Sequence, residues 1–312
     1  MLFGRSKGAG AAPSEEAADR AAESLRSIEA GGLPLAARER LAKLGQEKPG
    51  FFSSDLTTNE FLLMRQAGFR AITQVMGSCF YNVGWQYMPG GYGFMSGQVF
   101  ELDVPTKAWQ EARRLALSRL AEEARLAGAD AVVGVRIERG AYEWARGVVE
   151  FIAVGTAVKC DRFDIGEDKP VLSNLSGQDF AKLYLNGYWP VGIVAGTTLV
   201  YAMTGWQQQA SSGWMFSPNQ ELPDFTRGVH AARQAAMHRV HAQAADLGSP
   251  AGLVGMRFEL ETEEVERSTG NDTEVTDMIV IVHALGTAIV ELANRPEPTQ
   301  TYLALPLNEV TR

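Results

Sequence analysis

The chain contains residues 54–61, SDLTTNEF, and repeats them in altered form as residues 173–180, SNLSGQDF. The offset between the two stretches is 119 residues, and it grows to 121 between Gly134 and Gly255 and to 131 further on. An offset that grows by small insertions between matched segments is what duplication of a domain leaves behind. The sequence therefore predicts two copies of one structural unit.

Each copy is predicted to contain a short helix, a strand, a loop, a long helix and two further strands. Thr57 with Glu60, and Ser176 with Asp179, have the spacing of a capping box at the start of the short helix. The long helices carry apolar residues at steps of three and four, at Trp109, Ala112, Ala116, Leu120, Ala124 and Ala127 in the first copy and at Val229, Ala232, Ala236, Val240, Ala244 and Leu247 in the second. The many alanines in both stripes allow a close approach between helix and sheet.

The strand after each long helix is predicted from a period of two. Within residues 133–138, apolar side chains alternate with Gly134, Arg136 and Glu138, which indicates one buried and one polar face. The fold class is therefore α+β: two repeated units, each with a mostly antiparallel sheet covered by one long helix and preceded by a short helix.

The expected organisation has five parts. They are a helical, flexible N-terminal arm at 1–52, a first domain at 53–162, a linker at 163–171, a second, diverged domain at 172–293 and a C-terminal tail at 294–312. In the arm, Ser14 can cap a helix that ends at Gly31 and Gly32, and a second short helix follows. Two readings of the arm stay open, a partly ordered tail packed loosely on the body and a dedicated partner-binding arm.

Composition limits the classes of function. The 312 residues carry 37 Asp and Glu against 29 Lys and Arg, a formal net charge of −8, which argues against a nucleic-acid partner. Two cysteines, Cys79 and Cys160, exclude a disulfide framework and fit a reducing compartment, so a cytoplasmic location is expected. The N-terminus lacks the apolar core of a secretory signal, and no apolar stretch is long enough for a transmembrane segment.

Two motifs carry a resemblance. Residues 128–135 (GADAVVGV) follow an alanine-rich helix, and residues 155–159 (GTAVK) close the first domain. This part of the chain, most of 68–159, resembles the YbjQ family, whose label is heavy-metal binding. The resemblance implies a dodecin-like βαββ fold that assembles as a pentameric ring. The second copy has SPAG at 249–252 where the family motif has ADAV, so any role of Asp130 is absent there.

Candidate metal ligands are few. His238 and His241 lie three residues apart on the second long helix, and His230 shares nearly the same azimuth as His241. We expect ordinary surface histidines, with a divalent or heavy metal as the alternative and no resident cofactor. Neither cysteine belongs to a CxxC motif, so buried structural cysteines are expected.

Nucleophilic catalysis has no recognisable constellation either. His283 lies within an apolar run at 279–285, where a packed or hydrogen-bonded histidine is expected, and no phosphate loop or dinucleotide fingerprint occurs. Two glycine-rich segments concentrate large side chains that could contact a ligand or a partner, at Trp85, Tyr87, Met88, Tyr92 and Phe94 and at Trp206 and Trp214. Packing against a neighbouring domain is the alternative.

The sequence thus predicts a non-enzymatic binding or scaffold protein of the YbjQ type that forms a homo-oligomer. The charged pairs present in both copies, Arg136 with Glu138 and Arg257 with Glu259, are the expected subunit interface. For a pentamer of two-domain chains we expect five chains in two stacked rings. The alternatives are a heavy-metal-binding protein and an enzyme whose site forms between subunits.

Overall fold

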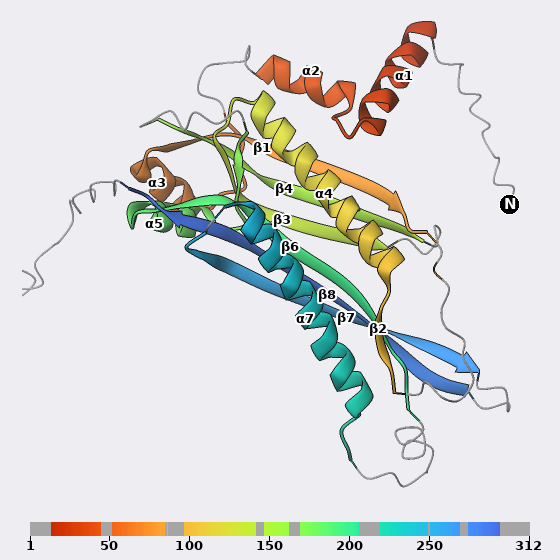
Figure 1. Cartoon of the computed structure of the whole chain (residues 1–312). Helices are drawn as coiled ribbons and strands as arrows, with labels where there is room; N and C mark the ends of the chain where they lie inside the picture. Colours follow the sequence, from red (N-terminus) through yellow and green to blue (C-terminus); the bar gives the residue numbers. More distant parts are fainter. Residues whose placement is uncertain are drawn as a thin grey trace, which may run out of the picture.

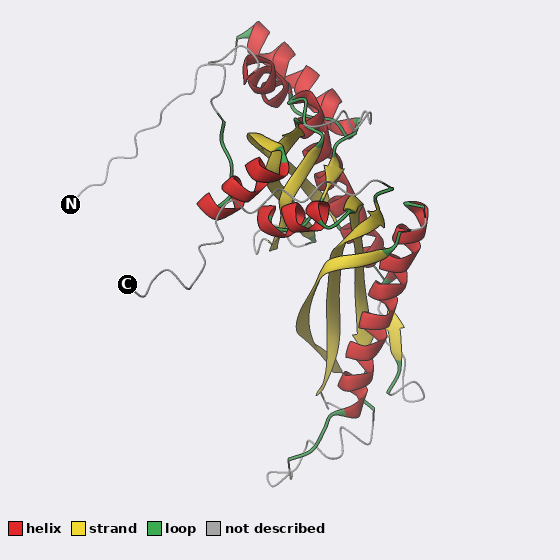
Figure 2. Ribbon diagram, turned by 90° about the vertical axis from the view of Figure 1, so that its left-hand side faces the viewer, coloured by secondary structure: helices red, strands yellow, loops and turns green. Residues whose placement is uncertain are grey.

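The computed structural model describes residues 14–44, 52–84, 86, 97–141, 147–161, 169–205, 219–248, 250–268 and 274–293. Within these ranges the chain forms two four-stranded sheets, each covered by one long helix (Figure 1). The predicted α+β class is confirmed. Figure 2 shows the two helix-covered sheets lying one beyond the other.

The first sheet has the order β1-β4-β3-β5 and is covered by helix α4. Its elements are β1 (Phe69–Asn82), β3 (Ala131–Ala141), β4 (Val148–Cys160), β5 (Val171–Leu172) and α4 (Asp103–Leu126). The second sheet has the order β2-β6-β8-β7 and is covered by helix α7. Its elements are β2 (Val99–Glu101), β6 (Tyr188–Ala202), β7 (Gly252–Ser268), β8 (Glu274–Glu291) and α7 (Pro223–Asp246). All strand pairs are antiparallel except β3 with β5.

The two parts of the chain that the sequence predicts as repeats, called the first and the second repeat below, exchange short strands. β2 belongs to the first repeat but pairs with β6 of the second, with Phe100 opposite Tyr201. β5 immediately precedes the second repeat's short helix but pairs with β3 of the first, with Val132 opposite Leu172. Because each sheet is completed by its neighbour, the repeats form one interlocked body. The domain boundaries stay a prediction, and most of the linker and all of the tail lie outside the described residues.

Helix ends follow the predicted local chemistry. Helix α3 (Thr58–Ala67) starts with a complete Thr57–Glu60 capping box and ends at Gly68, whose φ of 93° is left-handed. Helix α5 (Gly177–Leu185) begins where the Ser176 hydroxyl accepts a hydrogen bond from the Asp179 backbone N–H. The glycines after α4 and α7 also have positive φ, as the sequence predicts for helix C-termini.

Burial alternates over residues 133–138 as the sequence predicts, but the strand is not regular. A β-bulge interrupts the pairing of β3 with β4 between Val133 and Arg136, and Gly134 has a φ of 66° there. Val132 and Val133 are both buried, and they belong to two different hydrophobic clusters. β7 has the same bulge, with Gly255 at a φ of 62°. The stripe on α7 also ends early, because Leu247 is 39% exposed.

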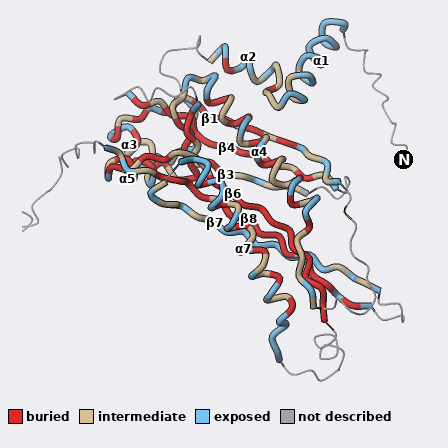
Figure 3. The backbone as a smooth tube through the Cα atoms, in the orientation of Figure 1, coloured by how far each residue is buried: buried red, intermediate tan, exposed pale blue. Residues whose placement is uncertain are grey.

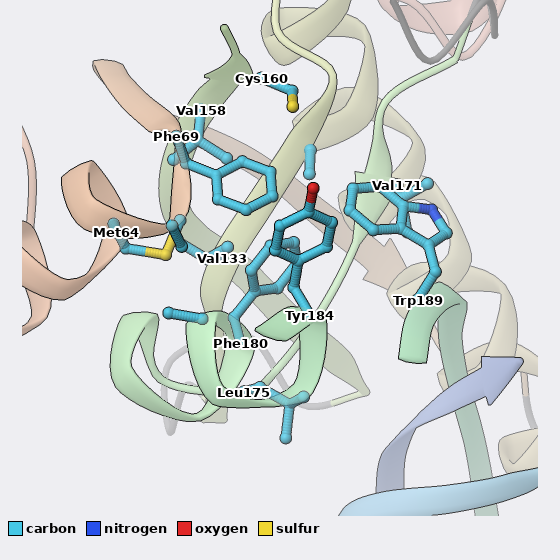
Figure 4. Packing of buried hydrophobic residues seen from close by; sticks show 13 residues of the cluster. Met64, Phe69, Val133, Val158, Cys160, Val171, Leu175, Phe180, Tyr184 and Trp189 are labelled. Carbon is cyan, nitrogen blue, oxygen red and sulfur yellow. The ribbon is translucent and has the colours of Figure 1, made fainter. Parts of the chain in front are cut away.

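A shared hydrophobic core joins the two repeats. Phe69 of the first repeat packs edge-on against Phe180 and Tyr184 of α5, at ring-centroid distances of 5.3 and 5.1 Å, and stacks on Trp189 at 6.2 Å (Figure 4). Burial is concentrated on the central strands β4, β6 and β8, whereas β7 is largely exposed (Figure 3). The junction between repeats is therefore part of the folding core.

The N-terminal arm contains helices α1 (Glu15–Glu29) and α2 (Leu35–Leu44). Arg119 of α4 holds the arm by donating hydrogen bonds to the carbonyl oxygens of Ile28 (3.1 Å) and Gly32 (3.2 Å), and a third to Ser78 of β1 (2.6 Å). Leu33 and Leu41 are buried, but α1 itself has no buried residue. The described part of the arm thus packs on α4 mainly through its turn and α2.

Candidate functional site: a polar cavity between the repeats

A cavity of about 220 Å³ lies where the first repeat meets the outer face of the second sheet. Its walls come from both repeats: Arg113 of α4, residues 135–139 of β3, Phe151 of β4, Arg257 and Glu259 of β7, and residues 283–285 of β8. The strand exchange described above positions these elements. The cavity therefore exists only because the two repeats are interlocked.

His283 forms the floor of this cavity. It is only 8% exposed, and its ring stacks on Trp109 at 5.1 Å between centroids and meets the edge of Phe151 at 6.4 Å. Its Nδ1 lies 2.9 Å from the Thr197 hydroxyl oxygen. Burial lowers the pKa of His283 to about 2, with a further contribution from the positive charges of Arg139 and Arg113. The imidazole is therefore neutral at physiological pH.

Arg113 fixes the orientation of the Thr197 hydroxyl. The guanidinium is 6% exposed and donates hydrogen bonds to Thr197 Oγ1 and, at 3.1 Å, to the Ala195 carbonyl. Burial lowers its pKa to about 10, and the positive charge of Arg239 adds to this shift. Because a guanidinium only donates, Thr197 Oγ1 is the acceptor in this contact, and its own proton can point at His283 Nδ1.

Arg139 completes the polar wall of the cavity. Its Nη2 donates to Glu259 at 2.5 Å and to Glu261 at 2.8 Å, so strand β3 of the first repeat is tied to β7 of the second. Its Nη1 is buried, as is Nε2 of His283, and neither atom has a hydrogen-bond partner among the described residues. An unpaired buried polar atom costs about 1–3 kcal/mol, so two of them in one cavity call for an explanation.

A second buried polar cluster, at the other end of β6 and β8, contrasts with this cavity. Asp277 is fully buried and accepts hydrogen bonds from Tyr201 (2.7 Å), the Thr204 backbone N–H (2.8 Å) and Arg267 (2.5 Å). The Arg267–Asp277 pair is satisfied on both sides. We therefore assign this cluster a structural role.

The charged residues predicted for a subunit interface lie along β3 and β7. Arg136, Glu138, Arg257 and Glu259 are all exposed. Arg136 forms an ion pair with Asp55, and Glu259 forms one with Arg139 at the junction between repeats. All four residues line the mouth of the cavity. Their role between chains stays a prediction.

The candidate metal ligands do not come together. His238 and His241 are exposed on α7, and Cys79 and Cys160 are buried as expected, 3% and 5% exposed. Across the described ranges, no three His, Cys, Asp or Glu side chains gather as a metal-binding group. The seven aromatic and methionine residues proposed for ligand or partner contact, Trp85, Tyr87, Met88, Tyr92, Phe94, Trp206 and Trp214, lie outside the described residues.

The sequence analysis missed Arg113, Arg139 and Thr197 as members of one site. It identified His283, and the expectation of a packed, hydrogen-bonded histidine is confirmed. One signal was available, because the counterparts of Arg139 and His283 in the other repeat are Leu260 and Ile152. Duplication alone would leave the same side chain at both positions, so a polar residue in one copy opposite an apolar one in the other is a candidate for a function specific to that copy.

The fold and the cavity together define a class: an α+β protein with two helix-covered sheets that interlock and enclose a polar site. Residues 95–161 match a family model, YbjQ, that is described as "Putative heavy-metal-binding". An encapsulin nanocompartment protein, Rv1762c of Mycobacterium tuberculosis, is 36% identical over 236 residues, which is 74% of this chain and 85% of that protein. A UPF0145 protein of Archaeoglobus fulgidus is 32% identical over 110 residues, 33% of this chain and 93% of its own length.

The chain belongs to the YbjQ family, which the name of the Archaeoglobus fulgidus relative gives as UPF0145. A shorter match, 52% identical over 58 residues, joins 19% of this chain to 54% of a UPF0145 protein of Halobacterium salinarum. No solved structure matches the chain. None of the helices in the described part of the chain has the length and hydropathy needed to span a membrane.

Proposed function

We propose that this protein is a non-enzymatic scaffold module of the cytoplasm that assembles into a ring of identical chains. One observation carries the proposal: surfaces that are buried at the junction between the two repeats are exposed at the equivalent places on the outer ends of the chain. The name of the Mycobacterium tuberculosis relative, an encapsulin nanocompartment protein, supports a scaffold-like role.

Four pairs of equivalent apolar positions differ in exposure. The exposed members are Phe52 (39%), Leu62 (51%), Phe80 (58%) and Leu222 (38%), and their counterparts at the internal junction are Val171 (5%), Ala181 (0%), Leu199 (6%) and Leu102 (3%). Exposed large apolar side chains mark interaction sites. Leu62 and Phe80 belong to the first repeat, which Phe52 immediately precedes, and Leu222 belongs to the second, so both ends of the chain carry them. A second copy of this chain fits them, because the same fold already covers their counterparts.

The backbone repeats the same arrangement. The backbone N–H of Asn174 donates to Thr287 Oγ1 at 3.1 Å, and that of Asp55 donates to Thr156 Oγ1, also at 3.1 Å. Residues 52–56 therefore sit on the first repeat as residues 171–175 sit on the second. Within residues 171–175, strand β5 pairs with β3. Residues 52–53 can pair in the same way with the outer edge of β7 in another chain.

Such contacts join the front of one chain to the back of the next. A head-to-tail interface of this kind is heterologous and closes into a ring when the rotation between chains permits. Inside one chain the first repeat pairs with the second, which favours a single ring in which the two repeats alternate. From the sequence we instead expect two stacked rings, each built from one kind of repeat. The pentamer stays a prediction. Within one chain Arg136 pairs with Asp55, which holds residues 52–56 in place for contact with the next chain.

The arm has to be accommodated in this assembly. Helices α1 and α2 lie beside β1 and α4, and together with Met76 and Phe80 they line a hollow of about 420 Å³. Phe80 stays 58% exposed in the presence of the arm. We therefore expect an incoming chain to contact the outer face of β1 and to meet the arm at its edge.

Light scattering on the Leu62→Lys variant tests the proposal. The wild-type chain should have a mass several times 33.9 kDa, and Leu62→Lys should reduce it toward one chain, because the new charge would be buried at the junction. The matched control is Leu126→Lys, since Leu126 is 39% exposed and its counterpart, Asp246, is exposed as well. A monomeric wild type, or an assembly that Leu62→Lys leaves intact, would contradict the proposal. Elemental analysis of the same sample tests for a heavy-metal carrier.

A further inference from the structure

We propose that the cavity between the repeats binds one small oxyanion, a phosphate or carboxylate group, through Arg139 and His283. The assignment does not depend on the ring, because both residues belong to one chain. It starts from the two buried donors that lack partners among the described residues, Arg139 Nη1 and His283 Nε2. His283 is more than nine-tenths buried.

The two unpartnered atoms are both donors when the neutral His283 ring carries its hydrogen at Nε2. The Thr197 hydroxyl accepts a hydrogen bond from Arg113, and in one of the two neutral tautomers of His283 it donates its own proton to Nδ1 at 2.9 Å. A neutral imidazole that accepts at Nδ1 carries its hydrogen at Nε2. The cavity thus presents an N–H from His283 and an N–H from Arg139. A metal ion needs acceptor atoms at these positions, whereas an oxyanion needs donors.

The charge of the lining points the same way. Four guanidinium groups, those of Arg113, Arg136, Arg139 and Arg257, face two carboxylates, Glu138 and Glu259. These lining residues alone carry a net charge of +2, four Arg less two Glu, against −8 for the whole chain, whereas Asp55 and Glu261, which pair with Arg136 and Arg139, lie outside the lining. Glu259 and Glu261 already pair with Nη2 of Arg139, so they compete with a bound anion for the same guanidinium.

The site should occur once per chain. The equivalents of Arg139 and His283 are Leu260 and Ile152, so a junction between chains would present apolar side chains where the internal junction presents two donors. Arg233, the equivalent of Arg113, instead packs over the ring of Phe258 at 5.5 Å. A stoichiometry of one anion per chain therefore distinguishes this site from a repeated one.

Isothermal titration calorimetry of the full chain tests the proposal, with inorganic phosphate and acetate titrated separately at constant ionic strength. At least one anion should bind with a Kd of about 1 mM or tighter and with one site per chain. Arg139→Met and His283→Phe should each weaken binding at least about tenfold. The two anions separate the sources of the ligand, because preference for phosphate or for acetate identifies the group that the site recognises.

Glu259→Gln should tighten binding, because it removes a competing carboxylate and leaves both donors in place. This variant decides the matter even if Arg139→Met and His283→Phe fail to fold, since the Glu259 side chain is 56% exposed. Arg114→Met, which breaks an exposed pair with Glu111 on α4, should leave binding unchanged. The proposal is overturned if neither anion binds wild type at about 10 mM, or if Glu259→Gln does not tighten binding.

Discussion

At the scale of single residues, His283 shows how strongly position determines chemistry. The chain has four histidines, and three of them lie exposed on α7, whereas His283 lies between Trp109 and Phe151 in the junction. Arg113 and Arg139 approach it from the first repeat, and Thr197 and Glu259 flank it on the neighbouring strands of the second sheet. Two nearby guanidinium groups and burial both oppose a third positive charge, so the ring stays neutral.

The stability of the protein should therefore decrease in mild acid. The pKa of His283 is lowered to about 2 in the folded chain, while the unfolded chain binds a proton near pH 6.5. The contribution of His283 is fully present above pH 6.5 and is lost as the pH falls toward 2, by about 1.4 kcal/mol per pH unit. Between pH 6.5 and 5 we expect a loss of about 2 kcal/mol in the free energy of unfolding.

Urea denaturation at a series of pH values measures this loss. His283→Phe serves as the comparison, because phenylalanine keeps a ring beside Trp109 but cannot take up a proton. Its stability should change much less over the same pH interval. Equal slopes for the two proteins would show that His283 does not determine the acid sensitivity.

At the scale of elements, local signals predicted most of what the structure shows. Capping boxes, C-terminal glycines and alanine stripes act over a few residues, so Thr57, Gly68 and Ala116 could be interpreted directly. The exchanged strands could not be predicted, because β2 and β5 have only three and two residues and show no periodicity. The cavity depends on that exchange, and Arg139 lies just beyond the strand predicted at 133–138, so its place in the cavity was not predicted.

The close packing of helix on sheet gives an element-scale prediction. Gly77 of β1 lies under α4, and a Cβ at this position would come within 2.0 Å of the Ala116 carbonyl oxygen; Gly196 has the same relation to Ala236. Gly77→Ala should therefore separate helix from sheet and cost about 3 kcal/mol in unfolding free energy. The denaturation midpoint in urea measures the cost.

Gly252→Ala is the matched control for this substitution. A Cβ there would meet nothing within 4 Å, and its φ is not in the left-handed region, so the change should stay within about 0.5 kcal/mol. If Gly77→Ala is as stable as Gly252→Ala, the helix does not approach the sheet as closely as the structure places it.

At the scale of the whole molecule, the chain has two ends that match each other. At one end, β7 has the same bulge, with a glycine, as β3. At the other end, residues 52–56 donate the same backbone hydrogen bond to a threonine hydroxyl as residues 171–175 do. Under the predicted duplication and the proposed assembly, each chain has one internal junction and the two halves of a second. Fusing two repeats halves the number of separate interfaces that a ring of a given size has to form.

A disulfide across the proposed junction tests this arrangement and counts the chains. Val132 pairs with Leu172 inside the chain, and their counterparts are Leu253 and Ser53, so Leu253 of one chain should pair with Ser53 of the next. Paired strand residues lie within the Cα separation of about 4.4–6.8 Å that a disulfide spans. The double variant Ser53→Cys with Leu253→Cys should therefore form covalent multimers on oxidation, and Cys79 and Cys160 should not interfere because both are buried.

The pattern of products on a non-reducing gel then distinguishes the arrangements. A closed head-to-tail ring gives a ladder that ends at the number of chains in the ring, so a pentamer ends at five chains. Either single variant links at most two chains, because each carries only one half of the junction. A double variant that stays monomeric on oxidation while light scattering reports an oligomer would place the interface elsewhere on the chain, away from residues 52–56 and the β7 edge.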